Sequence, residues 1–388
     1  MLTPGRVPID SWAPELEATA MAQAVNLSNL PFAISHVALM PDAHAGYGMP
    51  IGGVLFADRA VVPYAIGVDI GCGVALLDTD LTVDDLPRPV LRRLLEAIAR
   101  GVPVGTAHQH APVDRERALD EIGLDLPASI PAAWFERSVD SLGTLGSGNH
   151  FLEVQRDETG RVAVMLHSGS RSLGKTICDA FQQTALALCR ARRLPLPHDE
   201  LAYLPEDTPE FDAYWSAMTF ALRFAEVNRS RMLEAAERAI TAHTRARRVE
   251  RTVDIHHNYA ARERHAGRDG IVHRKGAVRA AAGEIVLIPG SMGTTSYVAE
   301  GLGNAASFET CQHGAGRAMS RTKARQAMTP GEVFDRMAAL GIELQSGDPR
   351  SAAEEAPSAY KDIEAVMAHS ADLVRPIRRL TPLGVLKG

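Results

Sequence analysis

The stretch "GSGNHFLEV", residues 146–154, sets a glycine turn, an asparagine and a histidine directly before a short hydrophobic strand. Side chains alternate between the two faces of a strand, so Phe151 and Glu153 share one face. His150 stands at the mouth of this predicted strand, with the amide of Asn149 beside it. Taken alone, the pattern also fits an Asx-type turn whose histidine is satisfied inside the core. The rest of the chain decides between a functional and a structural histidine.

The arrangement recurs in "VAVMLHSGSR", where a buried-looking strand ends at His167 and a serine-glycine turn leads to Arg171 and a helix. Backbone N–H groups at a helix start, together with a guanidinium, form an anion site. It recurs again in "VDIHHNYA". By strand alternation His257 continues the apolar face, whereas His256 faces the other way. His257 is therefore the predicted ligand, and His256 is a supporting or surface residue.

Short apolar runs broken by glycine turns indicate strands, and periodic segments indicate helices. Their order has no regular strand–helix–strand rhythm, which favours an α+β fold, with mixed or antiparallel sheets packed by helices, over a doubly wound sheet. No internal repeat or long linker divides the chain, so we expect one large domain over residues 1–388 with the active site at strand ends. The predicted strands fall in 33–80, 151–155, 162–166, 252–256 and 285–288, and the predicted helices cover 84–100, 172–191, 215–247 and 331–340.

The composition is that of an ordinary soluble globular protein, with 46% hydrophobic and 23% charged residues. The formal net charge of -6 argues against a basic coat for nucleic acid, although local patches can still bind phosphate. No apolar run is long enough to cross a bilayer, and "MLTPGRVPIDSW" lacks the apolar core of a signal peptide. Four cysteines are too sparse for a disulfide framework, so we expect a reduced, cytoplasmic setting and no membrane partner.

The turn "GVDIGCGV" holds Asp69 and Cys72 three residues apart, where flanking glycines let carboxylate and thiolate converge on one cation. Alternatively, Cys72 is a small buried hydrophobe and Asp69 caps the turn. With the three strand-end histidines, the turn supplies five N, S and O ligands. That set suits zinc, late transition metals or a mixed-ligand manganese site, and it argues against magnesium. Five ligands with a shared thiolate suffice for two adjacent cations, an arrangement typical of phosphoryl chemistry.

Further polar motifs fit phosphate chemistry. "IPGSMGTTSY" is a Gly/Ser/Thr-rich turn after a strand, and "HGAGRAMSR" sets His313, Arg317 and Arg321 at four-residue steps. If the segment after His313 begins a helix, the two arginines share a face. A neutral imidazole at His313 can attack phosphorus, provided that a partner orients its other nitrogen. Asp42 and His44, in "MPDAHAGYG", are the candidate partners.

Read together, these motifs resemble the RtcB-type RNA ligases. The matching strings run in the family's order from residue 41 to the last residue: "PDAHAGYGMPIGGV", "GVDIGCGV", "GSGNHFLEV", "LHSGSR", "HHNYA", "RKGA", "IPGSMGTTSYV", "HGAGR", "APSAYKD" and "LKG". The resemblance implies an RtcB-like fold and the joining of RNA 2′,3′-cyclic phosphate or 3′-phosphate ends to 5′-hydroxyl ends. It also implies GTP and two Mn²⁺ ions as cofactors. The implied RNA substrates are cleaved tRNA-like or damaged ends, and an activating protein partner is left unidentified.

The resemblance also implies roles for individual residues. The implied ligands of one Mn²⁺ are Asp69, Cys72 and His150, and those of the other are Cys72, His167 and His257. His313 is implied to attack the α-phosphate of GTP and become guanylylated, with Asp42 hydrogen-bonded to its other nitrogen. The residues implied to bind GTP or RNA phosphates are Asn149, Arg171, Lys275, Ser291, Gly314 and Arg317, and those implied to form the guanine pocket are Glu153, Tyr360 and Lys387.

Two other functions use the same motifs. A metal-dependent phosphohydrolase or cyclic phosphodiesterase would use these ligands with water as the nucleophile and would not need His313 or Lys387. A non-catalytic RNA-end-binding protein would bind RNA ends without joining them. Residues 101–140 carry no string that matches the family, and we interpret their His108 and His110 as exposed loop histidines.

Overall fold

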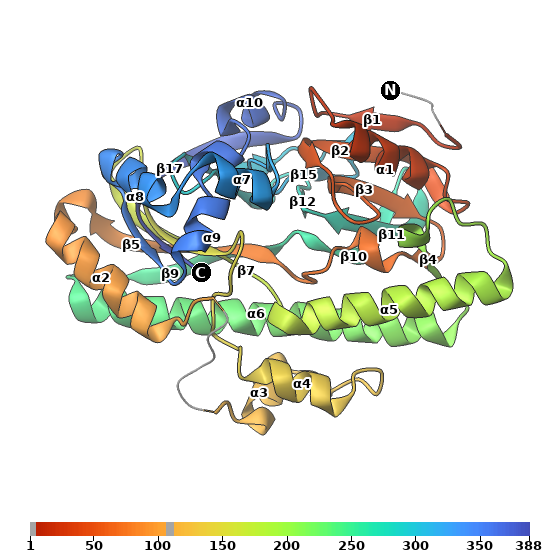
Figure 1. The fold of residues 1–388 in the computed structure, drawn as a ribbon, viewed down its shortest axis with the longest axis horizontal. Helices are drawn as coiled ribbons and strands as arrows, with labels where there is room; N and C mark the ends of the chain where they lie inside the picture. Colours follow the sequence, from red (N-terminus) through yellow and green to blue (C-terminus); the bar gives the residue numbers. More distant parts are fainter. Residues whose placement is uncertain (1–4, 106–111) are drawn as a thin grey trace.

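The computed structural model describes residues 5–105 and 112–388, so His108 and His110 lie outside the described residues. Two large sheets and two short strand pairs are packed by helices, which confirms the predicted α+β fold (Figure 1). All strand pairs in the described ranges are antiparallel except β1–β2 and β16–β17, which are parallel. None of the helices in these ranges is both long and apolar enough to cross a membrane.

The five-stranded sheet has the order β1-β2-β3-β11-β10, and the eight-stranded sheet has the order β13-β14-β17-β6-β7-β5-β9 with β16 beside β17. The strands of the first are β1 (Ile9–Ser11), β2 (Ala33–His44), β3 (Ile51–Ala57), β10 (Asn258–His265) and β11 (Arg268–Lys275). Those of the second are β5 (Gly73–Thr82), β6 (Phe151–Asp157), β7 (Arg161–Ser168), β9 (Val249–His256), β13 (Ile285–Ile288), β14 (Ser296–Gly301), β16 (Glu343–Ser346) and β17 (Val374–Lys387). The short pairs are β4 (Ala60–Val61) with β8 (Leu204–Pro205), and β12 (Ala277–Arg279) with β15 (Thr310–Gln312).

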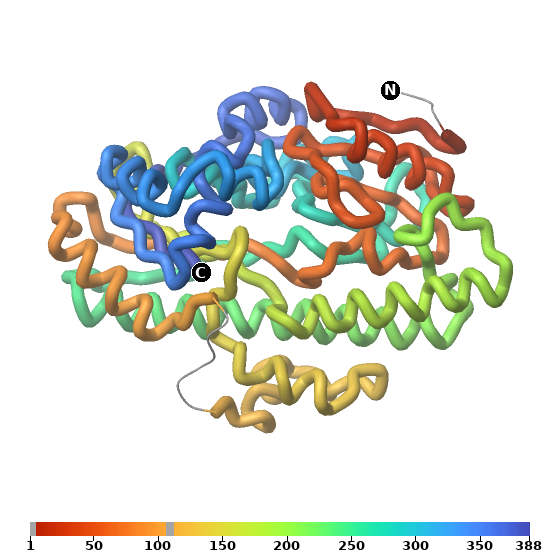
Figure 2. The backbone as a smooth tube through the Cα atoms, in the orientation of Figure 1, coloured from red at the N-terminus to blue at the C-terminus, as the bar shows by residue number. Residues whose placement is uncertain are grey.

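Helix α6 runs beneath both sheets and ties the two halves of the molecule together, and α5 lies beside it beneath the half that holds the five-stranded sheet (Figures 1 and 2). The helices are α1 (Ala18–Ser28), α2 (Arg88–Gly101), α3 (Arg115–Ile122), α4 (Ala132–Val139), α5 (Arg171–Arg192), α6 (Pro209–His243), α7 (Arg321–Ala327), α8 (Pro330–Ala339), α9 (Pro349–Glu354) and α10 (Ile363–Ala368). The small helices α3 and α4 lie on the side of α6 away from the sheets (Figure 1).

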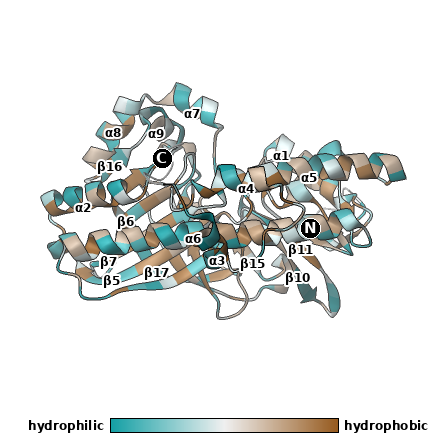
Figure 3. Ribbon diagram, turned by 90° about the horizontal axis from the view of Figure 1, so that it is seen from below, coloured by the Kyte–Doolittle hydropathy of each residue, from teal (hydrophilic) through white to brown (hydrophobic). Residues whose placement is uncertain are grey.

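The boundaries of several helices follow from their caps. Helix α6 begins earlier than the predicted residue 215, because the Thr208 side chain accepts a hydrogen bond from the Phe211 amide and Pro209 occupies the first turn. Helix α2 begins later than the predicted residue 84, because Val83–Asp85 forms a separate 3₁₀ turn with its own capping box. Brown and teal residues alternate along α6 in Figure 3, as expected of a helix with one face on the core.

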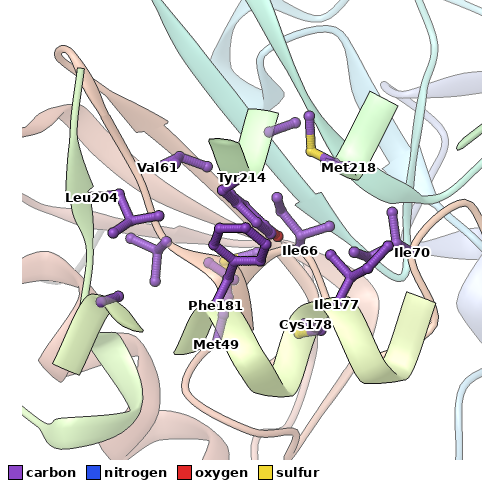
Figure 4. Close-up of a cluster of buried hydrophobic side chains, with 14 of the residues drawn as sticks. Met49, Val61, Ile66, Ile70, Ile177, Cys178, Phe181, Leu204, Tyr214 and Met218 are labelled. Carbon is purple, nitrogen blue, oxygen red and sulfur yellow. The ribbon is translucent and has the colours of Figure 1, made fainter. Parts of the chain in front are cut away.

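The core between α5 and α6 supports the turn that carries Asp69. Ile66 and Ile70, on either side of that residue, are fully buried with Ile177 of α5 and Tyr214 of α6 (Figure 4). Packing of this density resists small displacements, so the position of the turn is set by the hydrophobic core.

Candidate active site

Four neighbouring strands of the eight-stranded sheet present candidate ligands at one edge. β6, β7, β5 and β9 are antiparallel neighbours, so the beginnings of β6 and β5 lie beside the ends of β7 and β9. In this register Gly73 pairs with Ser168 on one side and with His256 on the other. The candidate ligands that the register gathers are Cys72, His150, His167 and His257. Residues far apart in sequence therefore meet because strand ends alternate in direction across the sheet.

The ligand atoms form two adjoining groups. The Sγ atom of Cys72 lies 3.2 Å from His167 Nε2 and 3.5 Å from His150 Nε2. His167 Nε2 lies 3.3 Å from His257 Nε2, and His150 Nε2 lies 3.0 Å from Asp69 Oδ2. Within each group the ligand atoms are all within 4.8 Å of one another, and Cys72 belongs to both groups. Strand alternation predicts His257, rather than His256, as the ligand. In the structure His257 is the one of the two that lies with Cys72 and His167.

Backbone carbonyls orient two of the imidazoles. His150 Nδ1 lies 2.9 Å from the Leu145 carbonyl oxygen, and His167 Nδ1 lies 3.1 Å from that of Asn149. A proton on each Nδ1, donated to these oxygens, leaves Nε2 with a lone pair directed at the thiol. Such hydrogen bonds on the outer nitrogen are the usual support of metal-bound histidine.

Burial favours the neutral form of the His167 and His257 imidazoles. It lowers the pKa of His167 and of His257 well below the usual value, and it raises the pKa of the Cys72 thiol. A neutral imidazole is the form that binds a metal, and a nearby cation reverses the burial effect on a thiol. Nitrogen, sulfur and carboxylate donors converging over a few ångströms fit a transition metal or zinc, so these residues suit the metal centre expected from the sequence.

His313 and Asp42 form a pair that links the short β12–β15 pair to the five-stranded sheet. Asp42, in β2, is fully buried, and His313 follows β15 directly. His313 Nδ1 lies 2.6 Å from Asp42 Oδ2, and the His313 ring centroid lies 4.9 Å from that of His257. The other candidate partner, His44, directs its Nδ1 at the Asp42 carbonyl oxygen, 2.9 Å away. Of the two candidates, Asp42 is thus the one that contacts His313, and it leaves His313 Nε2 as the reactive nitrogen.

A cavity of about 1280 Å³ opens over these groups, between elements of both sheets. The residues expected at the site that line this cavity are Asp69, Cys72, Asn149, Glu153, His167, His257, Lys275, Ser291, His313, Gly314, Arg317, Tyr360 and Lys387. Asp42 and His150 lie behind the cavity wall, where Asp42 contacts His313 and His150 contacts Cys72. A space of this size accommodates a nucleotide together with part of a second substrate.

Two of the expected phosphate-binding side chains, Arg171 and Lys275, make internal contacts. Arg171 donates to Thr144 Oγ1 and to the Gly105 carbonyl, each at 3.1 Å, and is not among the lining residues. Lys275 Nζ donates to three carbonyl oxygens, among them that of Met49 at 2.9 Å. Burial lowers the pKa of Lys275 to about 8. In this arrangement Lys275 holds the backbone of the cavity wall, and its ammonium protons are already engaged.

Glu355 is a buried acceptor that sequence reasoning missed. Its carboxylate pairs with Arg317 at 3.0 Å and with Lys387 at 3.7 Å, and it accepts a hydrogen bond from the Tyr360 hydroxyl. Arg317 also lies over the Tyr360 ring, with its guanidinium carbon 5.3 Å from the ring centroid. Glu355 therefore links three residues expected at the nucleotide site. The only signal in the sequence is a pair of acidic residues inside the apolar run "SAAEEAPSAY".

The segment directly after His313 does not begin a helix, so the condition for Arg317 and Arg321 to share a helix face is not met. Residues 314–320 are irregular, and α7 begins only at Arg321, with Ser320 as its cap. Gly316 has a φ of 71°, and a Cβ there would lie 2.4 Å from the Asp42 carbonyl oxygen. Glycine at this position allows the His313 loop to touch β2, and a helix would pull the loop away from Asp42.

Comparison with known proteins identifies the family. The family described as tRNA-splicing ligase RtcB matches residues 23–125 and 120–388. The chain is 40% identical to an RNA-splicing ligase RtcB of Escherichia coli strain K12, over 100% of this chain and 99% of that protein. It is 36% identical to an RNA-splicing ligase RtcB of Mycobacterium tuberculosis, over 94% and 100%, and 33% identical to a tRNA-splicing ligase RtcB of Aeropyrum pernix, over 95% and 91%. On these grounds the chain belongs to the RtcB family of RNA-splicing ligases.

Proposed function

We propose that this chain is a GTP-dependent RNA ligase that joins RNA 2′,3′-cyclic phosphate or 3′-phosphate ends to 5′-hydroxyl ends. One observation carries the proposal: the buried Asp42 holds His313 Nδ1 at 2.6 Å and leaves Nε2 for reaction beside the two ligand groups. A hydrolase that uses water has no need of a second, oriented imidazole at this place. The names of its relatives, RNA-splicing ligases, agree with the proposal.

The proposed reaction proceeds through a covalent nucleotide. A cyclic phosphate is first opened to a 3′-phosphate. His313 Nε2 attacks the α-phosphorus of GTP, a P–N bond forms, and pyrophosphate leaves. The RNA 3′-phosphate then takes the guanylate from His313, and attack by the 5′-hydroxyl on that activated phosphate releases GMP. Asp42 accepts a hydrogen bond from the Nδ1–H group throughout, and its negative charge stabilises the positive charge that develops on the imidazole ring.

The metal centre belongs to the proposal. Asp69, Cys72 and His150 would hold one Mn²⁺, and His167 and His257 would hold the second together with the shared thiolate. When bound, the ions supply Lewis-acid stabilisation of charge on phosphoryl oxygens. The chain's own part is to fix the ligands and to exclude bulk water from a largely buried site.

The proposal also covers the remaining cavity residues, the RNA substrates, the location and the extent of the domain. Ser291 and Gly314 line the cavity near His313, and Asn149 lies at its wall. We assign the guanine pocket to Glu153, Tyr360 and Lys387. The proposed RNA partners are cleaved tRNA-like or damaged RNA ends, the proposed location is the cytoplasm, and residues 1–388 are proposed to act as one ligase domain.

A joining assay tests the function. The protein is incubated with GTP, Mn²⁺ and two RNA fragments, one ending in a 2′,3′-cyclic phosphate and the other starting with a 5′-hydroxyl. The ligase forms the joined RNA, and a 5′-phosphorylated acceptor serves as the control that must not be joined. Phosphate release without joining would identify a phosphohydrolase or cyclic phosphodiesterase. RNA binding without either product would identify an RNA-end-binding protein.

Replacement of the two adjacent histidines should have unequal effects. His257→Ala removes an imidazole from a ligand group, whereas His256 lies outside both groups and contacts the Gly71 carbonyl and Glu226. We expect His256→Ala to retain at least about ten times more ligation activity than His257→Ala, since supporting contacts cost roughly 10- to 100-fold while a lost ligand costs more. Single-turnover ligation measures this, and the reverse order of activities would refute the strand-face argument.

Nucleotide binding should depend on the ionisation of Glu153. Burial raises the pKa of Glu153 to about 7, so its carboxylate forms as the pH rises through that value. An ionised Glu153 accepts both guanine N–H donors, whereas the protonated acid loses acceptor capacity. We expect the affinity for GMP, measured in EDTA to exclude metal effects, to rise about tenfold from pH 6 to pH 8. In Glu153→Gln the pH dependence should be flat, and an unchanged slope would contradict the assignment.

A further inference from the structure

Two adjacent polar side chains interrupt the buried face of α6. Asn228 and Arg229 are each 0% exposed, and Arg229 is among the largest fully buried side chains of the described residues. Asn228 stands four residues from the buried Phe224 and Met232, in the middle of an apolar stripe. Polar groups in such a position are costly unless they are fully hydrogen-bonded. Their contacts therefore show what they stabilise.

Arg229 contacts three segments that lead into the candidate ligands. Its Nη1 donates to the Gly71 carbonyl at 2.8 Å and to the Ser168 carbonyl at 3.1 Å. Its Nε donates to Asp254 at 2.6 Å, and its Nη2 lies 3.2 Å from His256 Nδ1. Gly71 precedes Cys72, and Ser168 follows His167. The other two partners lie on β9, which ends directly before His257.

Asn228 adds the fourth segment. Its Oδ1 accepts from the Gly143 amide at 2.7 Å and from the Thr144 amide at 3.3 Å. Its Nδ2 donates to Ser168 Oγ at 3.2 Å and to the Gly169 carbonyl at 3.0 Å. The contacts with Gly143 and Thr144 fix the beginning of the glycine-rich segment that leads to His150.

We propose that Asn228 and Arg229 form a clamp on α6 that positions all four ligand-bearing segments against one another. They are positioning residues, because neither is among the residues that line the cavity. The inference rests on the proposed function in one respect, namely that the two ligand groups bind metal. In this proposal, one turn of α6 keeps the two ligand groups within coordination distance of one another. The strand ends alone do not fix that distance.

The geometry leaves the clamp little tolerance. A Cβ at Gly73 would lie 3.0 Å from Arg229 Nη1 and 2.3 Å from the Ile255 carbonyl oxygen, so the guanidinium sits directly against the Cys72 turn. The guanidinium reaches the Gly71 and Ser168 carbonyls through Nη1 and the Asp254 carboxylate through Nε at once, which the single ammonium of lysine does not reproduce. The clamp therefore depends on the shape of the guanidinium as well as on its charge.

The clamp is tested by Arg229→Lys and Asn228→Ser, with Arg274→Lys as the matched control. Arg274 is also fully buried and is paired with Glu263, away from the ligand segments. Mn²⁺ affinity is measured by electron paramagnetic resonance on folded protein, with the folded fraction checked by circular dichroism. We expect the Kd for Mn²⁺ to rise about 10- to 100-fold in the two clamp variants and less than about twofold in the control.

Amide hydrogen exchange of the metal-free protein supplies a second measurement. In Arg229→Lys, exchange should quicken together in residues 68–73, 143–150, 167–171 and 254–257, while β2 stays protected. If Arg229→Lys binds Mn²⁺ as the unaltered chain does and exchange is unchanged, the clamp is refuted. If the unaltered chain binds no Mn²⁺ but exchange still quickens in these four segments, the clamp stands and the metal proposal fails. If Arg274→Lys changes the Kd for Mn²⁺ and the hydrogen exchange as much as Arg229→Lys does, the effects reflect general destabilisation and the clamp is refuted.

Discussion

His313→Ala is expected to abolish covalent retention of GMP and to lower RNA joining by about 10⁴-fold or more, as loss of a catalytic nucleophile does in other enzymes. The reason is geometric, because His313 combines a buried carboxylate partner on Nδ1 with a second ring nitrogen beside the ligand groups. The protein is incubated with GTP labelled at the α-phosphate and with Mn²⁺, and the label that stays on the chain is counted. The label should be acid-labile, as a P–N bond is, and mass spectrometry should map it to His313.

Asp42→Asn is the matched variant for this prediction. Asparagine keeps the size of the side chain but removes the negative charge that stabilises a protonated imidazole, so labelling should slow by about 10³- to 10⁴-fold while the fold is retained. Because Asp42 is fully buried, circular dichroism and thermal melting must accompany the assay. Label retained in full by His313→Ala, or mapped to another residue, would overturn the assignment of the nucleophile.

Cys72→Ser is expected to remove both of the proposed metal ions at once. The Sγ atom of Cys72 belongs to both ligand groups, and a neutral serine hydroxyl is a much weaker ligand for a divalent cation than a negatively charged thiolate. Bound Mn²⁺ per chain, measured by equilibrium dialysis at a concentration that saturates the unaltered protein, should fall from two ions to none. The affinity for each ion should drop by more than about 100-fold, beyond the loss caused by changing a supporting residue.

Two single replacements provide the comparison for Cys72. Asp69 belongs to one group and His257 to the other, so Asp69→Asn and His257→Ala should each leave about one ion bound. A Cys72→Ser variant that still binds one ion tightly would show that the thiolate serves a single ion. Two ions bound by all three variants would place the metal elsewhere.

The sequence predicts the strand-end ligands well because each lies where a local apolar pattern stops. His150, His167 and His257 were found by strand alternation and glycine turns, which are local features. The choice of His257 over His256 also came from periodicity. The main strands and the helices α5 and α8 were recovered within a few residues for the same reason.

What the sequence could not supply depends on contacts between distant residues. Glu355 gains its importance from the cations around it, and Asn228 and Arg229 gain theirs from contacts with two turns and with β7 and β9. The four-residue spacing of the arginines after His313 leaves a helix open as one possibility, whereas the contact of this loop with Asp42 requires irregular backbone. Helices α3 and α4 are only eight residues long each, too short for periodicity to separate them from loops.

The antiparallel order of β6, β7, β5 and β9 also has a kinetic consequence. β5 pairs with β9 across a separation of at least 170 residues, and this pairing brings His257 to the ligand group that also holds Cys72 and His167. The other group, Asp69, Cys72 and His150, comes from the first 150 residues and does not need β9. Closing the long loop between β5 and β9 is among the slow events of folding, so the group that contains His257 should be completed last. A chain stalled before that pairing would lack one of the two ligand groups and would remain inactive.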